Sequence, residues 1–217
     1  TAASKIQDGD VILTYAKSSI VLKSISRAHH NGKHFRVIVI DSKPLFEGKY
    51  LARDLARAGV PVTYYMIASA QHAVQEATKV FLGASAMMSN GRLYSRVGTA
   101  IVAMLAHERD TPVIVCCESI KFSNKVALDS IVSNELAPVH ELLGGVGAVQ
   151  LTDYDGMPRK DGLLHKWSET PHLQMLNVMY DVTPADCISM IITEYGSLPP
   201  SSVPAVRRHL GEGDEEQ

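Results

Sequence analysis

The first half of the chain repeats one unit, in which a short apolar or β-branched run is followed by a segment with helical spacing. The run Arg36–Ile40 is continuous rather than alternating, which is typical of a strand covered on both faces. Similar runs occur at 11–14, 60–65, 79–84 and 111–117. Alternation of this kind predicts strand–helix units and therefore an α/β fold.

Helices are expected between these runs, over 20–30, 48–58, 70–77 and 97–107. Ser18 or Ser19 can cap the first of them, and Asn31-Gly32 ends it. We predict a Rossmann-like, mostly parallel sheet flanked by helices in a single domain, residues 1–209. A last helix is expected over 182–194, with Thr183 as cap and Pro184 at its first position. The acidic end, 210–217, is expected to be disordered.

Composition excludes several functional classes. The 21 Lys and Arg residues against 23 Asp and Glu give a net charge of −2, so the chain lacks the basic field that nucleic acid requires. No apolar run approaches the ~20 residues of a membrane-spanning helix, so no membrane role is expected. The 3 cysteines form no disulfide framework, which favours a reducing compartment, the cytosol.

Motifs for metal or nucleotide cofactors are incomplete. His140-Glu141 begins like a zinc helix, but Gly144 stands where the second histidine is required. Gly145-Val146-Gly147 lacks the third glycine of a dinucleotide loop, and the acidic loop at Asp153 lacks the distal glutamate of a calcium site. We therefore predict no metal site and no cofactor.

Two segments are candidates for binding or chemistry. Residues 83–99 leave a strand, turn at Asn90-Gly91 and enter a helix at Gly98-Thr99, so their N–H groups could hold an anion beside Arg96. A plain strand-to-helix loop explains the same residues equally well. Cys116-Cys117 ends a predicted strand, where a nucleophile is conceivable, although buried structural cysteines are the commoner case.

Residues 172–180 are apolar on both faces if they form a strand. A central strand buried on both sides is one explanation. The other is a subunit interface, and its candidate residues are Leu176, Val178 and Tyr180.

Several motifs are similar to those of one family. It contains methylthioribose-1-phosphate isomerase, ribose-1,5-bisphosphate isomerase and the alpha, beta and delta subunits of eukaryotic translation initiation factor 2B. The similarity covers residues 5 to 209 and rests on the segments 83–99, 39–48, 180–184 and 194–204. Within the family, segments 116–122 and 131–136 resemble the delta branch.

The resemblance implies a scaffold without isomerase chemistry and with no catalytic residue. In the isomerases an aspartate follows Gly-Ala at the fourth strand, whereas this chain has Ser85, whose hydroxyl is no acid or base near neutral pH. What the resemblance retains is a vestigial anion or sugar-phosphate pocket, formed by Gly83, Ser85, Asn90, Gly91, Arg96, Gly98 and Thr99. The alternative is a surviving sugar-phosphate isomerase or sugar-phosphate-binding sensor.

The resemblance also implies partners. A regulatory subunit of the guanine nucleotide exchange factor for translation initiation factor 2 would pair with the beta subunit, or with a second copy when alone. The alpha, gamma and epsilon subunits and factor 2, especially its phosphorylated alpha subunit, are the further expected partners. A helical amino-terminal region is expected to precede the present chain in the full-length protein.

Overall fold

The computed structural model describes residues 1–129, 134–143, 164 and 166–212. Its main layer is a seven-stranded sheet with the order β10-β9-β7-β4-β1-β2-β3, in which only β10 runs antiparallel to its neighbour. Its strands are β1 (Val11–Tyr15), β2 (Arg36–Asp41), β3 (Val62–Met66), β4 (Lys79–Gly83), β7 (Val113–Cys116), β9 (Met190–Thr193) and β10 (Gly196–Leu198). The predicted α/β fold and the five predicted strands are therefore confirmed.

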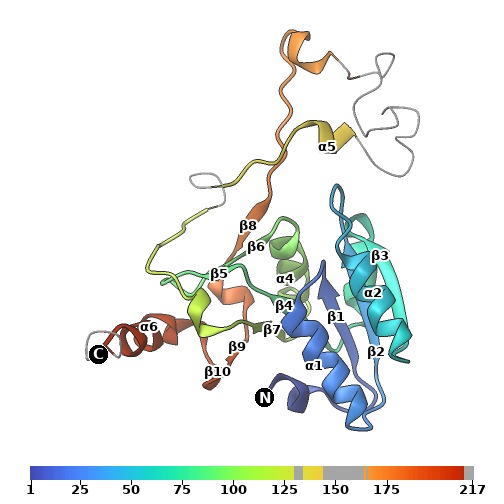
Figure 1. The fold of residues 1–217 in the computed structure, drawn as a ribbon, viewed down its shortest axis with the longest axis vertical. Coiled ribbons are helices and arrows are strands. Elements are labelled where there is room, and N and C mark those ends of the chain that lie inside the picture. Colours follow the sequence, from blue (N-terminus) through green and yellow to red (C-terminus); the bar gives the residue numbers. More distant parts are fainter. Residues whose placement is uncertain (130–133, 144–163, 165, 213–217) are drawn as a thin grey trace.

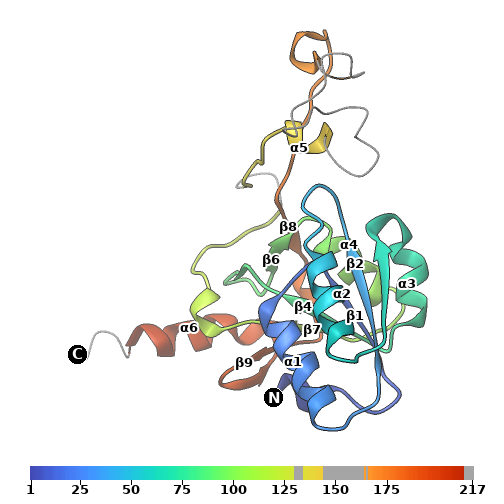
Figure 2. The same ribbon diagram turned by 45° about the vertical axis from the view of Figure 1, so that its right-hand side comes forward.

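Helices cover both faces of this sheet (Figures 1 and 2). The α-helices are α1 (Ser19–His30), α2 (Gly48–Arg57), α3 (Ala70–Glu76), α4 (Thr99–His107), α5 (His140–Leu143) and α6 (Val203–Glu212). The short 3-10 helices are η1 (Ala2–Lys5), η2 (Ile67–Ser69), η3 (Ser119–Lys121), η5 (Trp167–Glu169), η6 (Ala185–Cys187) and η7 (Pro200–Ser202). As the sequence predicted, Ser18 caps α1, accepting the Val21 N–H at 3.4 Å.

The strands bury side chains on both faces, as their continuous apolar runs require. In β1, Leu13 packs in the core on the side of α3 and α4, while Ile12 packs in the core on the side of α1 and α2. Both side chains are fully buried. Because successive residues of a strand point to opposite faces, a run without alternation fits only between two helical layers.

The small antiparallel sheet is the first departure from the sequence analysis. It has the order β5-β6-β8 and contains β5 (Ala86–Met87), β6 (Leu93–Arg96) and β8 (Tyr180–Thr183). Residues 83–99 are therefore a hairpin followed by a helix entrance rather than a plain loop. The hairpin turns at Gly91, which has a φ of +76°, a conformation that glycine adopts without steric cost.

The predicted helix over 182–194 is wrong. The segment forms β8, the single turn η6 and then β9. Pro184 removes a donor and follows Thr183, the last residue of β8, while Ile191 and Ile192 pair with β7. Tertiary pairing with two sheets therefore outweighs the helix start signal of Thr183-Pro184.

The predicted strand over 172–180 is also corrected, since only Tyr180 belongs to a strand. The rest forms one side of an extension that leaves the body of the domain, which we call the arm, residues 134–143 and 166–179 (Figures 1 and 2). Its two sides pair through Ala137 N–H to Asn177 O at 2.9 Å and Met179 N–H to Glu135 O at 3.0 Å.

The acidic end differs in part from the expectation of disorder, because α6 continues through Glu212. Residues 213–217 lie outside the described residues, as do the glycines at 145 and 147 and the acidic loop that begins at Asp153.

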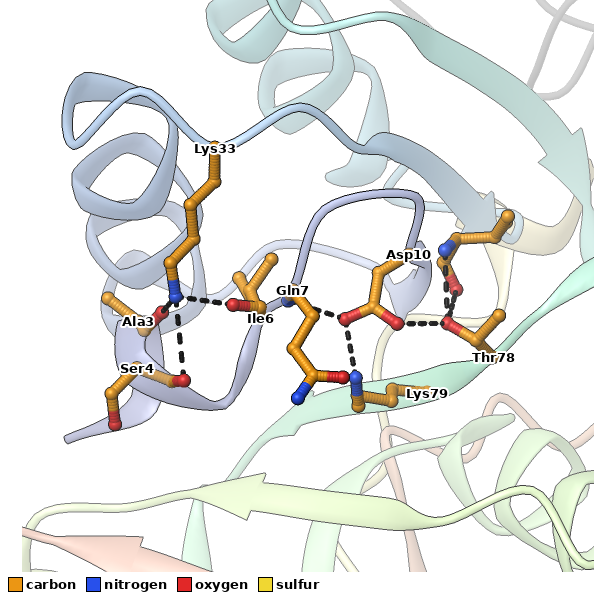
Figure 3. A network of polar contacts seen from close by, with 9 residues as sticks. Ala3, Ser4, Ile6, Gln7, Asp10, Lys33, Thr78 and Lys79 are labelled. Carbon is orange, nitrogen blue, oxygen red and sulfur yellow. Dashed lines mark hydrogen bonds and ion pairs between the residues drawn. The ribbon is translucent and has the colours of Figure 1, made fainter.

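Two polar clusters tie the amino-terminal residues to the body of the domain (Figure 3). They lie at the end of the sheet opposite the arm (Figure 1). The Lys33 ammonium donates to the carbonyl oxygens of Ala3, Ser4 and Ile6. The Asp10 carboxylate accepts hydrogen bonds from Gln7 N–H, Thr78 Oγ1 and Lys79 Nζ. Burial acts to raise the pKa of Asp10, but the bonds from Lys79, Gln7 and Thr78 leave that pKa below its ordinary value.

Candidate functional site

A polar pocket of about 230 Å³ lies at the carboxyl ends of β1 and β4, the edge where open parallel sheets hold their ligands. It is lined by Tyr15, Ala16, Lys17, Ser18, Ser19, Glu47, Leu82, Gly83, Ala84, Ser85, Ser95, Arg96, Thr99 and Lys121. Four of the seven residues expected in an anion pocket are among them, namely Gly83, Ser85, Arg96 and Thr99.

The other three expected residues have structural partners elsewhere. Asn90 donates its amide to the carbonyl oxygen of Ala127 at 2.8 Å. A side chain at Gly91 would meet the backbone of Pro200, and one at Gly98 would meet the ring of Tyr15. These glycines are explained by close packing and positive φ values.

The start of α4, which the sequence suggested as the anion cradle, is occupied by the chain's own carboxylate. Asp181 Oδ2 accepts the N–H of Gly98 at 2.7 Å and that of Ala100 at 3.0 Å. Its Oδ1 is buried and has no hydrogen-bond partner among the described residues. Burial raises the pKa of Asp181 to about 6, against the opposing effect of these two bonds.

A second internal carboxylate fills the start of α2. Asp41 Oδ2 accepts the Lys49 N–H at 3.1 Å and the Tyr64 hydroxyl at 2.8 Å, and the Asp41 side chain lies against Gly48. In contrast, α1 begins with the uncharged cap Ser18, and this end opens into the pocket. Of these three helix starts, that of α1 therefore keeps its partial positive charge available to a ligand.

The basic side chains of the pocket are Lys17, Lys121 and Arg96, against the carboxylate of Glu47. Arg96 binds Glu47 through one edge of its guanidinium, with Nε donating to Oε2 at 2.9 Å and Nη2 donating to Oε1 at 3.2 Å. This is the bidentate geometry that a phosphate would use. Glu47 thus stands where an anion bound to Arg96 would lie.

Among the described residues that line the pocket, Glu47 is the one carboxylate, and no histidine or cysteine accompanies it for proton transfer between carbons. Ser85 is exposed, and its N–H is used in the hairpin, bonded to the Tyr94 carbonyl at 3.0 Å. Glu47, the carboxylate of the lining, is paired with Arg96.

Cys116 and Cys117, the candidate nucleophiles at the end of β7, are buried. Burial raises the pKa of each thiol to about 12, so neither is a thiolate near neutral pH.

The three residues expected at an interface lie along the arm and its root. Leu176 is 65% exposed, whereas Val178 and Tyr180 are half-buried. A strand buried on both faces is therefore excluded for this segment. Opposite Val178 across the arm lies Leu136, which is 61% exposed.

Sequence reasoning missed Lys17, Ser18, Glu47 and Lys121 as pocket residues. Lys17 and Ser18 follow β1, Glu47 lies at the end of the loop after β2, and Lys121 lies after β7. The carboxyl ends of parallel strands share one edge of the sheet. That rule could have grouped them, although the pairing of Glu47 with Arg96 joins residues far apart in sequence.

Among the residues described, no group of three or more His, Cys, Asp and Glu side chains is arranged to hold a metal ion. Within the same part of the chain, no helix has the length and apolar character needed to cross a bilayer.

The fold and the pocket define a class, a Rossmann-like domain with a polar pocket at the carboxyl ends of its strands and a projecting arm. The model of the initiation factor 2 subunit family matches residues 1–200. The chain belongs to this family, and the resemblance drawn from its motifs is confirmed.

Three relatives place it further. The chain is 47% identical over 206 residues to translation initiation factor eIF2B subunit delta of Schizosaccharomyces pombe, covering 94% of this chain and 42% of that protein. It is 32% identical over 198 residues to ribose 1,5-bisphosphate isomerase of Pyrococcus furiosus, covering 91% and 56%. The solved eIF2B-beta2-delta2 complex from C. thermophilum matches with a TM-score of 0.70 at 33% identity, covering 88% of this chain and 52% of that chain. The chain thus spans less than half the length of the delta relative.

Proposed function

We propose that the chain is the carboxyl-terminal regulatory domain of a delta subunit of the exchange factor for translation initiation factor 2, and that it acts in the cytosol without catalysis of its own. The observation that carries this proposal is the 47% identity to a protein named as that subunit, against 32% to a named isomerase. The pocket chemistry agrees, since Ser85 and the paired Glu47 offer no free carboxylate.

Enzyme assays test the absence of isomerase activity. We expect no turnover of ribose-1,5-bisphosphate or methylthioribose-1-phosphate above background, because Glu47, the carboxylate among the described lining residues, is paired with Arg96 and Ser85 stands in place of an acidic residue. Turnover well above background that Ser85→Ala abolishes would overturn the regulatory proposal. The P. furiosus isomerase is a suitable positive control for the first of these substrates.

The proposed partner is the beta subunit of the same factor, or a second copy of this chain when it is alone. Two features support this assignment, the similarity to a beta–delta complex and the exposed Leu136 and Leu176 on the arm. Exposed apolar side chains on one projecting element mark an interaction surface. The alpha, gamma and epsilon subunits and phosphorylated factor 2 are proposed contacts of the full-length protein, with its helical amino-terminal region.

Sedimentation of the chain alone and mixed with the beta subunit tests the pairing. We expect a complex of the two at micromolar concentration and self-pairing when the beta subunit is omitted. A chain that sediments as a monomer in both samples would contradict the proposed interface.

A second candidate function, binding a small phosphorylated compound without turnover, is favoured by one observation. The pocket brings three basic side chains and the start of α1 together in about 230 Å³. Thermal unfolding with inorganic phosphate and with ribose-1-phosphate analogues tests it, because a ligand of the folded state raises the melting temperature. Protection that Arg96→Ala leaves unchanged would exclude Arg96 as the anion contact, and no protection at all would exclude the pocket as a phosphate site.

A further inference from the structure

Arg96 connects the pocket to the arm. Its guanidinium is held by Glu47 on the pocket side, and its central carbon lies 5.3 Å from the centre of the Tyr180 ring. A planar guanidinium can use its edge for a carboxylate and its face for an aromatic ring at the same time. Arg96 makes both contacts.

Tyr180 is the residue at which the arm ends and β8 begins. Its ring stacks on that of Tyr94, with 4.7 Å between the centres and 23° between the planes. Its backbone is fixed by the Asn134 side chain, which accepts the Tyr180 N–H at 3.2 Å and donates to the Tyr180 carbonyl at 2.5 Å. Both sides of the arm are therefore joined at this residue.

The neighbouring contacts also converge on the root of the arm. The Val97 N–H donates to the carbonyl of Met179 at 3.0 Å. The loop before α2 contributes Phe46 and Glu47 to a small cavity that Ala137 and Met179 of the arm also line. The loop before α2, whose Glu47 binds the Arg96 guanidinium, thus lies against the arm as well.

We propose that Arg96, held by Glu47, is a positioning residue that sets the direction of the arm, and that pairing through Leu176 and Val178 depends on it. This inference rests on the proposed interface. Arg96 contacts the arm at its root, whereas the exposed Leu176 lies farther along the arm than the contacts that fix Tyr180. A small reorientation at the root displaces Leu176 by more than the root itself moves.

The test compares Arg96→Met, which removes the charge and keeps the length, with Arg36→Met. Arg36 is the control because it also pairs with a glutamate, Glu76, at 2.8 Å and starts β2 at the opposite end of the strands. Amide hydrogen exchange of Met179 and Tyr180, measured on dilute monomer, reports the root of the arm directly. We expect amide exchange to be at least tenfold faster in Arg96→Met and unchanged in Arg36→Met. We also expect the dissociation constant for pairing with the beta subunit to rise about tenfold in Arg96→Met and to stay the same in Arg36→Met.

Exchange in Arg96→Met within twofold of the unaltered chain would overturn the proposal. Pairing that remains normal despite faster exchange would overturn it too, provided that Leu176→Glu abolishes pairing. If Leu176→Glu still pairs, the proposed interface fails, while the exchange result still decides whether Arg96 positions the arm. Glu47→Gln is the second variant should Arg96→Met not fold. It keeps the shape of Glu47 and loses its charge, and we expect about threefold faster exchange, with unchanged exchange again contradicting the proposal.

Discussion

The sheet body and the arm follow opposite rules of burial. In the body, Phe81 of β4 and Leu55 of α2 are fully buried, whereas in the arm Leu136 and Leu176 are more than half exposed. The core of the body is closed within one chain, because helices cover both faces of its sheet, although surface residues such as Ile120 are exposed. The arm has only its own two sides and its root. The buried apolar residues of the body therefore report stability, and the exposed leucines of the arm are the ones expected to report association.

The largest expected effect lies in the body. Phe81→Ala should lower the free energy of unfolding by about 3–5 kcal/mol, because it removes a buried ring and leaves a cavity between the sheet and the layer of α1 and α2. Denaturant unfolding followed by circular dichroism measures this. Leu136→Ala is the control on the arm and should change the same quantity by less than about 0.5 kcal/mol. Equal losses in both variants would erase the distinction between the two regions.

On the arm, a charge should act on association instead. Leu176→Glu or Val178→Asp should leave the chain folded but shift it to monomer and remove beta-subunit binding, because a buried unpaired charge at an interface costs roughly 2–5 kcal/mol. Sedimentation at micromolar concentration is the measurement, with circular dichroism as the folding control. Normal pairing in a folded variant would place the interface elsewhere, and unfolding would assign the segment to the core.

Asp181, which joins the small sheet to α4, should make stability depend on pH. Its pKa is raised to about 6 in the folded state, so the folded protein takes up a proton before the unfolded chain does. Stability from this group is therefore lowest above pH 6 and rises as pH falls toward 4, by about 2–3 kcal/mol. Asp181→Asn should abolish this rise, as seen by comparing unfolding free energies of the two proteins across pH 4–7.

Asp10→Asn supplies a control of opposite sign. The pKa of Asp10 is lowered in the folded state, so its contribution is present above its unfolded pKa and is lost as pH falls through the folded value. A curve for Asp181→Asn parallel to that of the unaltered chain would mean that Asp181 titrates at its ordinary pKa.

The smallest of these effects concerns the amino-terminal anchor. Lys33→Met should cost about 1–2 kcal/mol, because three carbonyl oxygens lose a charged donor at a partly buried position. Thermal unfolding measures the loss, and Lys23→Met on helix α1, which ends just before Lys33, is the control. Pairing through the arm should be unchanged in both, since the anchor lies at the far end of the sheet. Weakened pairing in Lys33→Met would contradict the independence of the two ends.

The body was predictable because its signals are local. A run such as Arg36–Ile40 predicts a strand covered on both faces. Ser18 and Asn31 stand directly before and directly after helix α1 and mark its two ends. The failures begin where partners are distant. Thr183-Pro184 is a sound helix start by itself, but pairing of β8 with β6 and of β9 with β7 overrides it.

The candidate site shows the same division. Its residue types, a basic side chain beside glycines and hydroxyls after a strand, are present in the stretch 83–99 and predict either an anion site or a plain strand-to-helix loop. Only the tertiary structure decided that Asp181 fills the start of α4, that Glu47 pairs with Arg96, and that the start of α1 opens into the pocket. The spacing of apolar residues along the chain predicts whether a segment is a strand or a helix. Which charged side chains pair depends on which loops the folded sheet brings together at the carboxyl ends of its strands.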